Sequence, residues 1–538
     1  MDVMGERLLR KGDYVYGSFF KPESVDGYIN GVNPGDRADV LGRFPFSESS
    51  VDEALDYAGI GVRTWKRISV ADRAASIRRF RDNLLRYLEP TARLVTRETG
   101  KPLWEARQEI QAAVRSIDFF LEAGPALLEP QVIDAINARS DLLPRGVVGI
   151  LCPYNFPILI PTTHTVAAML AGNAVVVKPS KFTPGVGQAL ASLWDRCKLP
   201  RGIYNMVQGP GSVVGQRLAN HPNLDALLFS GAYATANAIN RLTADRVELP
   251  TLIQSGGKGT AIVLDDADLD RAAYEVVVGA FLTAGQRHNS TGRVLVTNGI
   301  FERFIEQIVA RSAQLQIGYG TEKDVFMGPL ISENLRTRYR RFCRKLTGQG
   351  HQALLEPGHV KLESRRGFYA RPAIYRVHWD NGNPMLDEEP PGPTLLVYRV
   401  SHWEEAAALH NQAAFRGATS LFTQPSNPVI YEMQDRLRTG TLNINRGTIG
   451  SSIRLATSGL GRSSNGHPNG LGLLRFLTHP RSQLIEDRPL LEAQTALPGL
   501  HWEMAAASLG PDAPTESPPD PTDDELLDVS SSLELAAE

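Results

Sequence analysis

The chain has 538 residues, which is too long for one ordinary hydrophobic core and predicts roughly three to four domains or one large enzyme with several lobes. Its 57 Lys and Arg residues nearly balance its 59 Asp and Glu residues. The overall charge therefore gives no reason to expect binding to nucleic acid or to an anionic membrane. A small molecule or another protein is the expected partner.

The cysteines and the start of the chain indicate the compartment. Cys152, Cys197 and Cys343 lie far apart and have no metal-ligand spacing, which favours a reducing compartment and argues against a disulfide framework or a zinc site. The charged start, MDVMGERLLRKG, has no apolar run of the kind that a signal peptide needs, and no unbroken apolar stretch of about 18 residues predicts a membrane span. The sequence predicts a soluble cytoplasmic protein.

A helical pattern extends from about residue 50 to 125, where apolar residues recur at spacings of three and four with charged residues between them. This period is typical of amphipathic helices, and the stretch fits two or three helices packed on a surface. Gly100 and Pro102 form a stop signal that is expected to close the helical block.

From residue 146, short apolar runs alternate with helical segments, as in GVVGILCPYNFP, NAVVVKPS, YNMVQG and ALLFSG. This alternation predicts an α/β fold with a parallel sheet covered on both faces. Asn155, Lys178 and Ser230 end or follow such runs, so they are expected at the carboxyl ends of strands, where open α/β sheets bind ligands. The alternation returns between about 255 and 450 and predicts a second α/β lobe.

Two further segments are expected to lie outside the lobes. Residues 138–146 and 471–486 can form strands of an arm or an oligomer contact. After about residue 495 the sequence is rich in Pro, Ser and acidic residues and has no Lys or Arg, so it cannot bury enough apolar surface to offset its ordering entropy. We expect a disordered acidic tail, in which DELLDVSSSLELAAE can fold as a short helix on a protein partner.

Six motifs in the chain follow one another in an order that is informative. The motifs are RETGKP (97–102), PYNFP (153–157), GNAVVVKPSKFTP (172–184), LLFSG (227–231), SGGK (255–258) and TAGQR (283–287). Their order and spacing resemble the aldehyde dehydrogenase superfamily, and within it the sequence looks most similar to succinylglutamate semialdehyde dehydrogenases. The resemblance implies two Rossmann-type lobes with parallel sheets, a β oligomerisation arm, and a homodimer or homotetramer.

The resemblance also implies a division of the chain into domains. Residues 1–127 and 146–254 would form a nucleotide-binding-type domain, and residues 255–470 a catalytic-type domain. Residues 128–145 and 471–490 would form the oligomerisation arm. Residues 491–538 would remain as the disordered acidic, proline-rich tail.

The catalytic positions depart from the family pattern. In the family a cysteine thiolate attacks the aldehyde and a glutamate activates water, and the resemblance places these positions at His288 and Gln254. An imidazole is bulkier than a thiol, and its adduct with an aldehyde is poorly placed to release hydride. A glutamine amide cannot take a proton at neutral pH. Asn155 matches the asparagine that donates to the developing oxyanion.

The resemblance also marks cofactor positions, with binding of NAD or NADP as the implied property. The matching residues are Lys178 at the adenine ribose, Gly211 and Gly231 where the backbone approaches the nucleotide, and Glu389 at the nicotinamide ribose. The serine expected at the pyrophosphate is Ala232, and the next glycine of that motif is Ala236. Lys181 replaces the glutamate that binds the ribose, a change that favours a 2′-phosphate and thus NADP.

Two hypotheses of function follow from these positions. The first is a catalytically impaired or inactive homologue with a binding, regulatory or structural role. The second is an active NAD(P)-dependent oxidoreductase on a semialdehyde that uses His288 in a non-standard way. Cys152 is the only thiol near the motifs that can be considered as a substitute nucleophile, and a metal site at His288 lacks a second ligand at suitable spacing.

Overall fold

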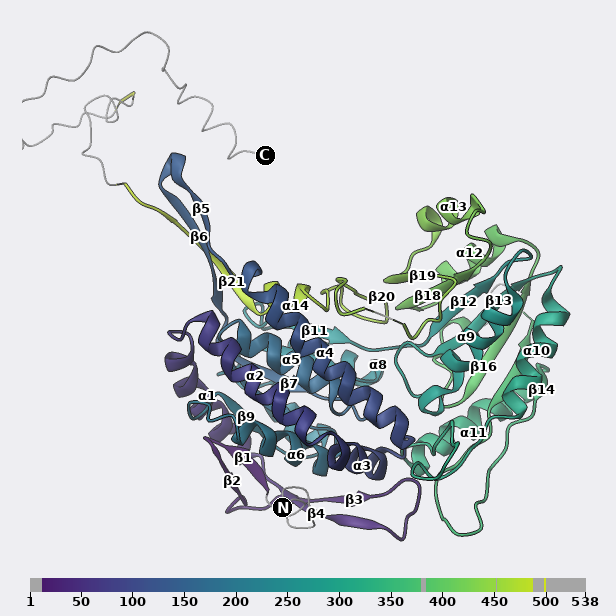
Figure 1. The fold of residues 1–538 in the computed structure, drawn as a ribbon, viewed down its shortest axis with the longest axis horizontal. Helices are drawn as coiled ribbons and strands as arrows, with labels where there is room; N and C mark the ends of the chain where they lie inside the picture. Colours follow the sequence, from purple (N-terminus) through teal and green to yellow (C-terminus); the bar gives the residue numbers. More distant parts are fainter. Residues whose placement is uncertain (1–11, 379–383, 451, 487–497, 500–538) are drawn as a thin grey trace, which may run out of the picture. The chain divides into compact units, whose positions relative to one another are not determined.

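The computed structural model of the protein describes residues 12–378, 384–450, 452–486 and 498–499 (Figure 1). The chain forms two compact units, one of residues 1–133 with 139–483 and one of residues 134–138 with 484–538. The sheets and helices that build the candidate site lie in the first unit. Apart from residues 498 and 499, the predicted tail, 491–538, lies outside the described residues.

The first lobe is built on a seven-stranded sheet in the order β11-β10-β7-β8-β9-β1-β2 (Figure 1). Strands β7 to β11 are parallel, whereas β1 is antiparallel to both β9 and β2. The strands are β1 (Asp13–Val15), β2 (Ser18–Phe20), β7 (Val147–Leu151), β8 (Ala174–Lys178), β9 (Tyr204–Met206), β10 (Ala226–Ser230) and β11 (Thr251–Gln254).

Successive side chains of these strands point to opposite faces of the sheet. Val148 and Ile150 of β7 join one buried cluster, whereas Val147 and Leu151 join another. Helices α2 to α6 contribute to the first cluster, and α1, α7 and α8 contribute to the second. Both faces are therefore covered, which explains why the strands read as continuous apolar runs in the sequence.

Four helices occupy residues 49–127, more than the two or three that the periodicity predicts. They are α1 (Ser49–Trp65), α2 (Val70–Arg86), α3 (Leu88–Thr99) and α4 (Leu103–Leu127). Gly100 has a left-handed φ of 77° and ends α3, while Pro102 is the N-cap of α4. The predicted stop signal therefore separates two helices instead of closing the block, because proline is tolerated at the start of a helix.

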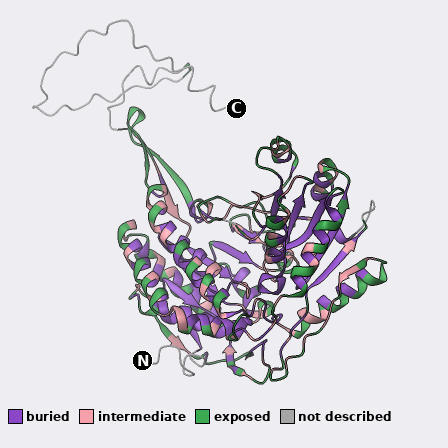
Figure 2. Ribbon diagram, turned by 45° about the vertical axis from the view of Figure 1, so that its right-hand side comes forward, coloured by how far each residue is buried: buried purple, intermediate pink, exposed green. Residues whose placement is uncertain are grey.

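The other helices of this lobe alternate with the strands. They are α5 (Leu159–Leu170), α6 (Pro184–Asp195), a π-helical turn at Gly211–Gly215, α7 (Gln216–Ala219) and α8 (Tyr233–Leu242). Figure 2 shows the strands of both large sheets as buried and the outward faces of the helices as exposed. The α/β prediction is confirmed.

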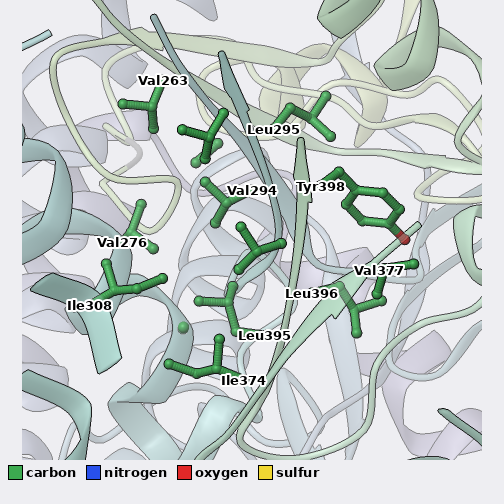
Figure 3. Close-up of a cluster of buried hydrophobic side chains, with 14 of the residues drawn as sticks. Val263, Val276, Val294, Leu295, Ile308, Ile374, Val377, Leu395, Leu396 and Tyr398 are labelled. Atoms are coloured by element: carbon green, nitrogen blue, oxygen red, sulfur yellow. The ribbon is translucent and has the colours of Figure 1, made fainter. Parts of the chain in front are cut away.

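The second lobe is built on another seven-stranded sheet, in the order β14-β15-β16-β13-β12-β18-β19. Its neighbouring strands are parallel except for β14 and β15. Val294 and Leu396 from the sheet pack with Val276 and Ile308 from the helices in one buried cluster (Figure 3). The strands are β12 (Gly259–Val263), β13 (Thr291–Thr297), β14 (Gln352–Leu355), β15 (Ala373–Val377), β16 (Thr394–Val400), β18 (Ala418–Phe422) and β19 (Thr441–Ile444).

The helices of the second lobe complete the predicted alternation. They are α9 (Leu269–Phe281), α10 (Phe301–Ala313), α11 (Glu333–Gly348), α12 (Trp403–Gln412) and α13 (Val429–Arg436). Two small two-stranded sheets pair β3 (Gly27–Val32) with β4 (Val40–Phe46), and β17 (Phe415–Arg416) with β20 (Leu460–Gly461).

The predicted extra strands form a three-stranded sheet in the order β21-β6-β5. Its members are β5 (Gln131–Ile133), β6 (Ala138–Pro144) and β21 (Thr478–Leu484). The segment before β21 is not extended but forms the short helix α14 (Gly472–Phe476), whose Leu473 and Leu474 are buried against the first lobe. The predicted strand in 471–486 is thus confined to β21.

Candidate active site

A cleft of about 1100 Å³ opens at the carboxyl ends of the parallel strands in the first lobe. The last residues of four strands line it: Leu151, Lys178, Ser230 and Gln254. This is the edge at which open α/β sheets bind ligands. The cleft brings together all eight residues that the sequence marks for the site: Asn155, Lys178, Lys181, Gly211, Gly231, Gln254, His288 and Glu389.

A second cavity of about 650 Å³ shares part of its wall with the cleft. The residues common to both are Ile160, Gln254, Gly256, Arg287 and His288. We call this shared wall the junction. It contains no thiol and no carboxylate, so it offers neither a thiolate nucleophile nor a carboxylate base.

The loop that carries His288 has a strained backbone. Thr283 and Ala284 both lie in the left-handed region, with φ of 58° and 52°, which is unfavourable for residues that have a Cβ. Asn155 reaches this loop and donates from Nδ2 to the backbone oxygen of Gln286 at 2.8 Å. One N–H of the Asn155 amide is therefore used to hold the loop, and the other is left for a ligand.

The His288 imidazole is open to the cleft, and its ring lies edge-on to Phe156 with 6.2 Å between ring centroids. Among the described residues, none forms a hydrogen bond with either ring nitrogen. Although the ring is exposed to the cleft, the enclosing protein and the Arg287 guanidinium lower its pKa from 6.5 to about 4. The imidazole is therefore neutral at pH 7, and its low basicity makes it a weak general base.

Gln254 lies at the same junction. Its Oε1 accepts a hydrogen bond from Asn469 Nδ2 at 3.2 Å, which orients the side-chain amide. The amide can position a water molecule but cannot take its proton at neutral pH. The neighbouring Gly256 has a φ of +73°, and a Cβ at this position would lie 3.2 Å from the His288 Cβ. The left-handed backbone at residue 256 thus favours glycine, and an added Cβ would also press on His288.

A network of buried charges lies beside the junction. Lys101 and Arg287 belong to the motifs RETGKP and TAGQR, but the sequence does not show which residues they pair with. Lys101 and Glu109 form an ion pair in which each side chain is 1% exposed. The other Glu109 oxygen accepts two backbone N–H groups at the start of α5, at 2.8 and 3.1 Å. Arg287 pairs with the buried Glu105 at 2.9 Å. The centroid of the Phe156 ring lies 4.5 Å from Lys101 Nζ and 5.2 Å from Arg287 Cζ. The two cations therefore hold this ring in place beside the junction.

Lys178 at the end of β8 and the start of α8, which follows β10, also line the cleft. Lys178 Nζ donates to the backbone oxygens of Pro179 and Gly209 at 2.7 and 3.1 Å, and burial lowers its pKa to about 8. Its ammonium group keeps a third N–H for a ligand. Ala232 is the N-cap of α8 and offers no side-chain cap, so the first N–H groups of this helix can receive a phosphate.

Glu389 lies on the opposite wall of the cleft. Burial raises the pKa of its carboxyl group, while the Lys258 ammonium and a backbone N–H of Gly257 oppose the rise. Lys258 itself is buried and donates from Nζ to the Gly392 oxygen at 2.6 Å; burial lowers its pKa to about 7. Glu389 therefore presents hydrogen-bond acceptors that suit sugar hydroxyl groups.

Cys152 lines the cleft but does not belong to the junction. Burial raises the pKa of its thiol to about 12, although the nearby Lys178 charge opposes the rise. The thiol is therefore protonated at pH 7 and poorly nucleophilic. This favours the inert role for Cys152 over the role of substitute nucleophile.

Arg115 of α4 is a candidate binding residue without a sequence motif. It belongs to the face of α4 that lines the second cavity, together with Gln108, Ala112 and Phe119. The other charged side chains of that cavity are paired, whereas Arg115 forms no ion pair or hydrogen bond with any described residue. The helical spacing of this face is the signal in the sequence, but it gains meaning only once the cavity is known.

Two broader findings apply to the described residues. No group of three or more His, Cys, Asp or Glu side chains in them is arranged to hold a metal ion. None of the helices formed by these residues is long and apolar enough to cross a membrane.

The fold and the cleft define a class of protein, and comparison with known proteins identifies it. The chain matches the Aldehyde dehydrogenase family over residues 19–482 and belongs to that family. It is 31% identical to the alpha-ketoglutaric semialdehyde dehydrogenase of Bacillus subtilis, over 84% of this chain and 93% of that relative. It is 32% identical to the N-succinylglutamate 5-semialdehyde dehydrogenase of Paraburkholderia xenovorans, over 87% of this chain and 96% of that relative.

Solved structures agree with this assignment. The NAD-dependent aldehyde dehydrogenase from Sinorhizobium meliloti superposes with a TM-score of 0.85 at 28% identity, covering 91% of this chain and 98% of that one. Lactaldehyde dehydrogenase from Escherichia coli gives a TM-score of 0.82 at 27% identity, covering 88% and 99%. The predicted aldehyde dehydrogenase fold and the likeness to succinylglutamate semialdehyde dehydrogenases are confirmed.

Proposed function

We propose that the protein is a catalytically impaired aldehyde dehydrogenase homologue that binds a nucleotide and a carboxylate ligand in a binding, regulatory or structural role. The observation that supports this is the junction, where His288 and Gln254 stand in place of the thiol and the carboxylate. The neutral, weakly basic imidazole of His288 cannot replace a thiolate that adds to an aldehyde and then leaves. The protonated Cys152 cannot replace it either.

The cleft presents hydrogen-bond donors and acceptors that suit NAD or NADP. Lys178 and Glu389 would hold the two ribose groups, and the N–H groups at the start of α8 would hold the pyrophosphate. Gly211 and Gly231 would let the backbone approach the nucleotide. An added Cβ at Gly211 would point into open space. When bound, the nicotinamide supplies a hydride acceptor; the relative from Sinorhizobium meliloti is NAD-dependent.

Lys181 is proposed to favour NADP. Its side chain is exposed on the cleft wall, with Nζ 5.3 Å from the Phe182 ring centroid, and can turn toward a 2′-phosphate. We expect Lys181→Glu to weaken NADP+ binding by roughly tenfold or more and to spare NAD+ binding, because a carboxylate repels the phosphate and accepts from a free 2′-hydroxyl. Isothermal titration with both cofactors measures this, with the exposed Lys21→Glu as the control; equal changes for both cofactors would contradict the role.

Arg115 is proposed to bind the carboxylate of the second ligand. The named relatives act on semialdehydes of carboxylic acids, and Arg115 supplies the unpaired cation of the corresponding cavity. We expect Arg115→Gln to lower the affinity for succinic semialdehyde by roughly tenfold and to leave the affinity for neutral butanal unchanged. Ligand-detected NMR gives both affinities, and Arg63→Gln, an exposed change on α1, is the control. A parallel loss for both aldehydes would refute the assignment.

The assembly and the domain division are further parts of the proposal. We propose a homodimer or homotetramer in which residues 128–145 and 471–490 form the oligomerisation arm. We also propose that residues 1–127 with 146–254 form a nucleotide-binding-type domain and residues 255–470 a catalytic-type domain. Val132 and Ile133 of β5 support the arm, because 58% and 45% of these apolar residues are exposed. Light scattering of the purified protein tests it, and a monomer would contradict it.

The tail is proposed to bind a protein partner in the cytoplasm, which a pull-down with and without residues 491–538 tests.

The decisive experiment is an assay of the purified full chain with NAD+ and NADP+ over a set of semialdehydes. We expect nucleotide binding by calorimetry and no reduction of either cofactor. Sustained turnover would reject the proposal and favour the active alternative. In that case His288→Ala would abolish activity if His288 is the reacting group, and Cys152→Ala would abolish it if the thiol is.

A further inference from the structure

A third cavity, of about 600 Å³, lies along α11 of the second lobe (α11 in Figure 1). Its lining comes from one edge of α11, from the segments near residues 357–359 and 369–370, and from Tyr375 of β15. It shares no lining residue with the cleft or with the second cavity. Its volume falls within the range of small-molecule sites, and neither the family chemistry nor the junction uses it.

The charged side chains that line this cavity are positive. Arg336, Arg340 and Arg344 line it at successive spacings of four residues on α11, and none of its lining residues is Asp or Glu. Glu333 neutralises Arg336 at 2.6 Å. Arg340 and Arg344 are exposed and form no ion pair or hydrogen bond with any residue that the structure describes. Like charges four residues apart on a helix repel each other, and among the described residues Arg340 and Arg344 have no paired counter-charge that relieves this repulsion.

The floor of the cavity is aromatic. Tyr339, Tyr369 and Tyr375 line it and are each no more than 1% exposed. Their hydroxyl groups donate to backbone oxygens, those of Arg371 at 2.7 Å, Gly35 at 3.0 Å and Cys343 at 3.3 Å respectively. The tyrosines are therefore buried and fixed, and they close the bottom of the cavity, while the two free guanidinium groups offer donors to an occupant.

We propose that this cavity is a second ligand site, which binds a small organic anion. Arg340 and Arg344 would hold its phosphate or carboxylate group, because guanidinium groups match such planar or tetrahedral oxyanions with paired hydrogen bonds. The site stands independently of the proposed nucleotide cleft, since the two share no residue.

The test uses the full chain with four probes: phenyl phosphate, benzoate, inorganic phosphate and benzyl alcohol. We expect saturable binding of phenyl phosphate or benzoate by calorimetry. Inorganic phosphate should bind more weakly because it has no organic body to fill the cavity, and benzyl alcohol because it has no anionic group. Comparison of phenyl phosphate with benzoate shows which anionic group the site prefers. Higher salt should weaken the binding, since the arginines are exposed.

The variants assign the binding to this cavity. The double change Arg340→Gln, Arg344→Gln should raise the dissociation constant by roughly tenfold or more, because two charge-assisted contacts are lost. The matched control is Arg303→Gln, Arg341→Gln, which removes the same charge from exposed arginines outside the cavity. The thermal midpoint of the wild type, but not of the first variant, should rise with phenyl phosphate. No saturable binding of any probe, or equal binding by the first variant and the wild type, would overturn the proposal.

Discussion

The double variant His288→Cys, Gln254→Glu is expected to oxidise semialdehydes at least roughly a hundredfold faster than the natural chain, since a general base alone contributes about a hundredfold to ten-thousandfold. The change restores a thiol and a carboxylate to the junction, where the structure places neither. Reduction of NAD+ or NADP+ by the purified variant measures the gain.

The geometry of the junction supports this expectation. A cysteine is smaller than the histidine and keeps the same Cβ, so it fits at position 288 without a new contact to Gly256. A glutamate at 254 is nearly isosteric with the glutamine and can accept the same hydrogen bond from Asn469. The strained loop is held by Asn155 and by the Arg287–Glu105 pair, neither of which is changed.

The two single variants serve as controls for the double variant. Gln254→Glu alone should stay at background, because no nucleophile is present. His288→Cys alone should form the covalent adduct but turn over slowly, because its hydrolysis lacks a base. If the double variant binds nucleotide and still shows no oxidation, the loss of function does not reside in these two positions, and the proposal that they disable the site fails.

The substitution Glu109→Ala is expected to destabilise the protein by about 3–5 kcal/mol, the range measured when one partner of a buried ion pair is removed. It would leave the Lys101 ammonium buried without its counter-charge and would also remove the acceptor of two N–H groups at the start of α5. Denaturant unfolding followed by circular dichroism measures the loss.

Two further variants separate the contribution of the charge of Glu109 from that of its hydrogen bonds. Glu109→Gln keeps an acceptor for the α5 N–H groups and should cost less than the alanine change. Glu122→Ala lies on the same helix and breaks an exposed pair with Arg454, in which about two thirds of each side chain is exposed (64% and 63%), so it should cost at most about 1 kcal/mol. A loss for Glu109→Ala as small as that for Glu122→Ala would show that the pair is not buried in solution.

The sequence predicts the fold well because strands buried on both faces leave continuous apolar runs. The runs that end at Lys178 and Ser230 correspond to β8 and β10, and the polar residues at their ends do line one cleft. The number of helices before the sheet was wrong because Gly100 and Pro102 act as the end of one helix and the start of the next. Local signals mark boundaries but do not say whether a new helix follows.

The missed parts of the site depend on contacts between distant segments. Arg287 and Glu105 are 182 residues apart, so their pairing leaves no local pattern. The cavity along α11 unites residues from Arg336 to Tyr375, and the spacing of its arginines alone describes an ordinary solvated helix edge.

The shared wall at His288 has a consequence for binding. Because one imidazole belongs to both cavities, a molecule that displaces the ring from one side changes the space left on the other. Such coupling is reciprocal, so each occupant alters the affinity of the other by the same factor. On the proposed function, the chain would respond to two compounds at once, and its output would be the degree of joint occupancy instead of a chemical product.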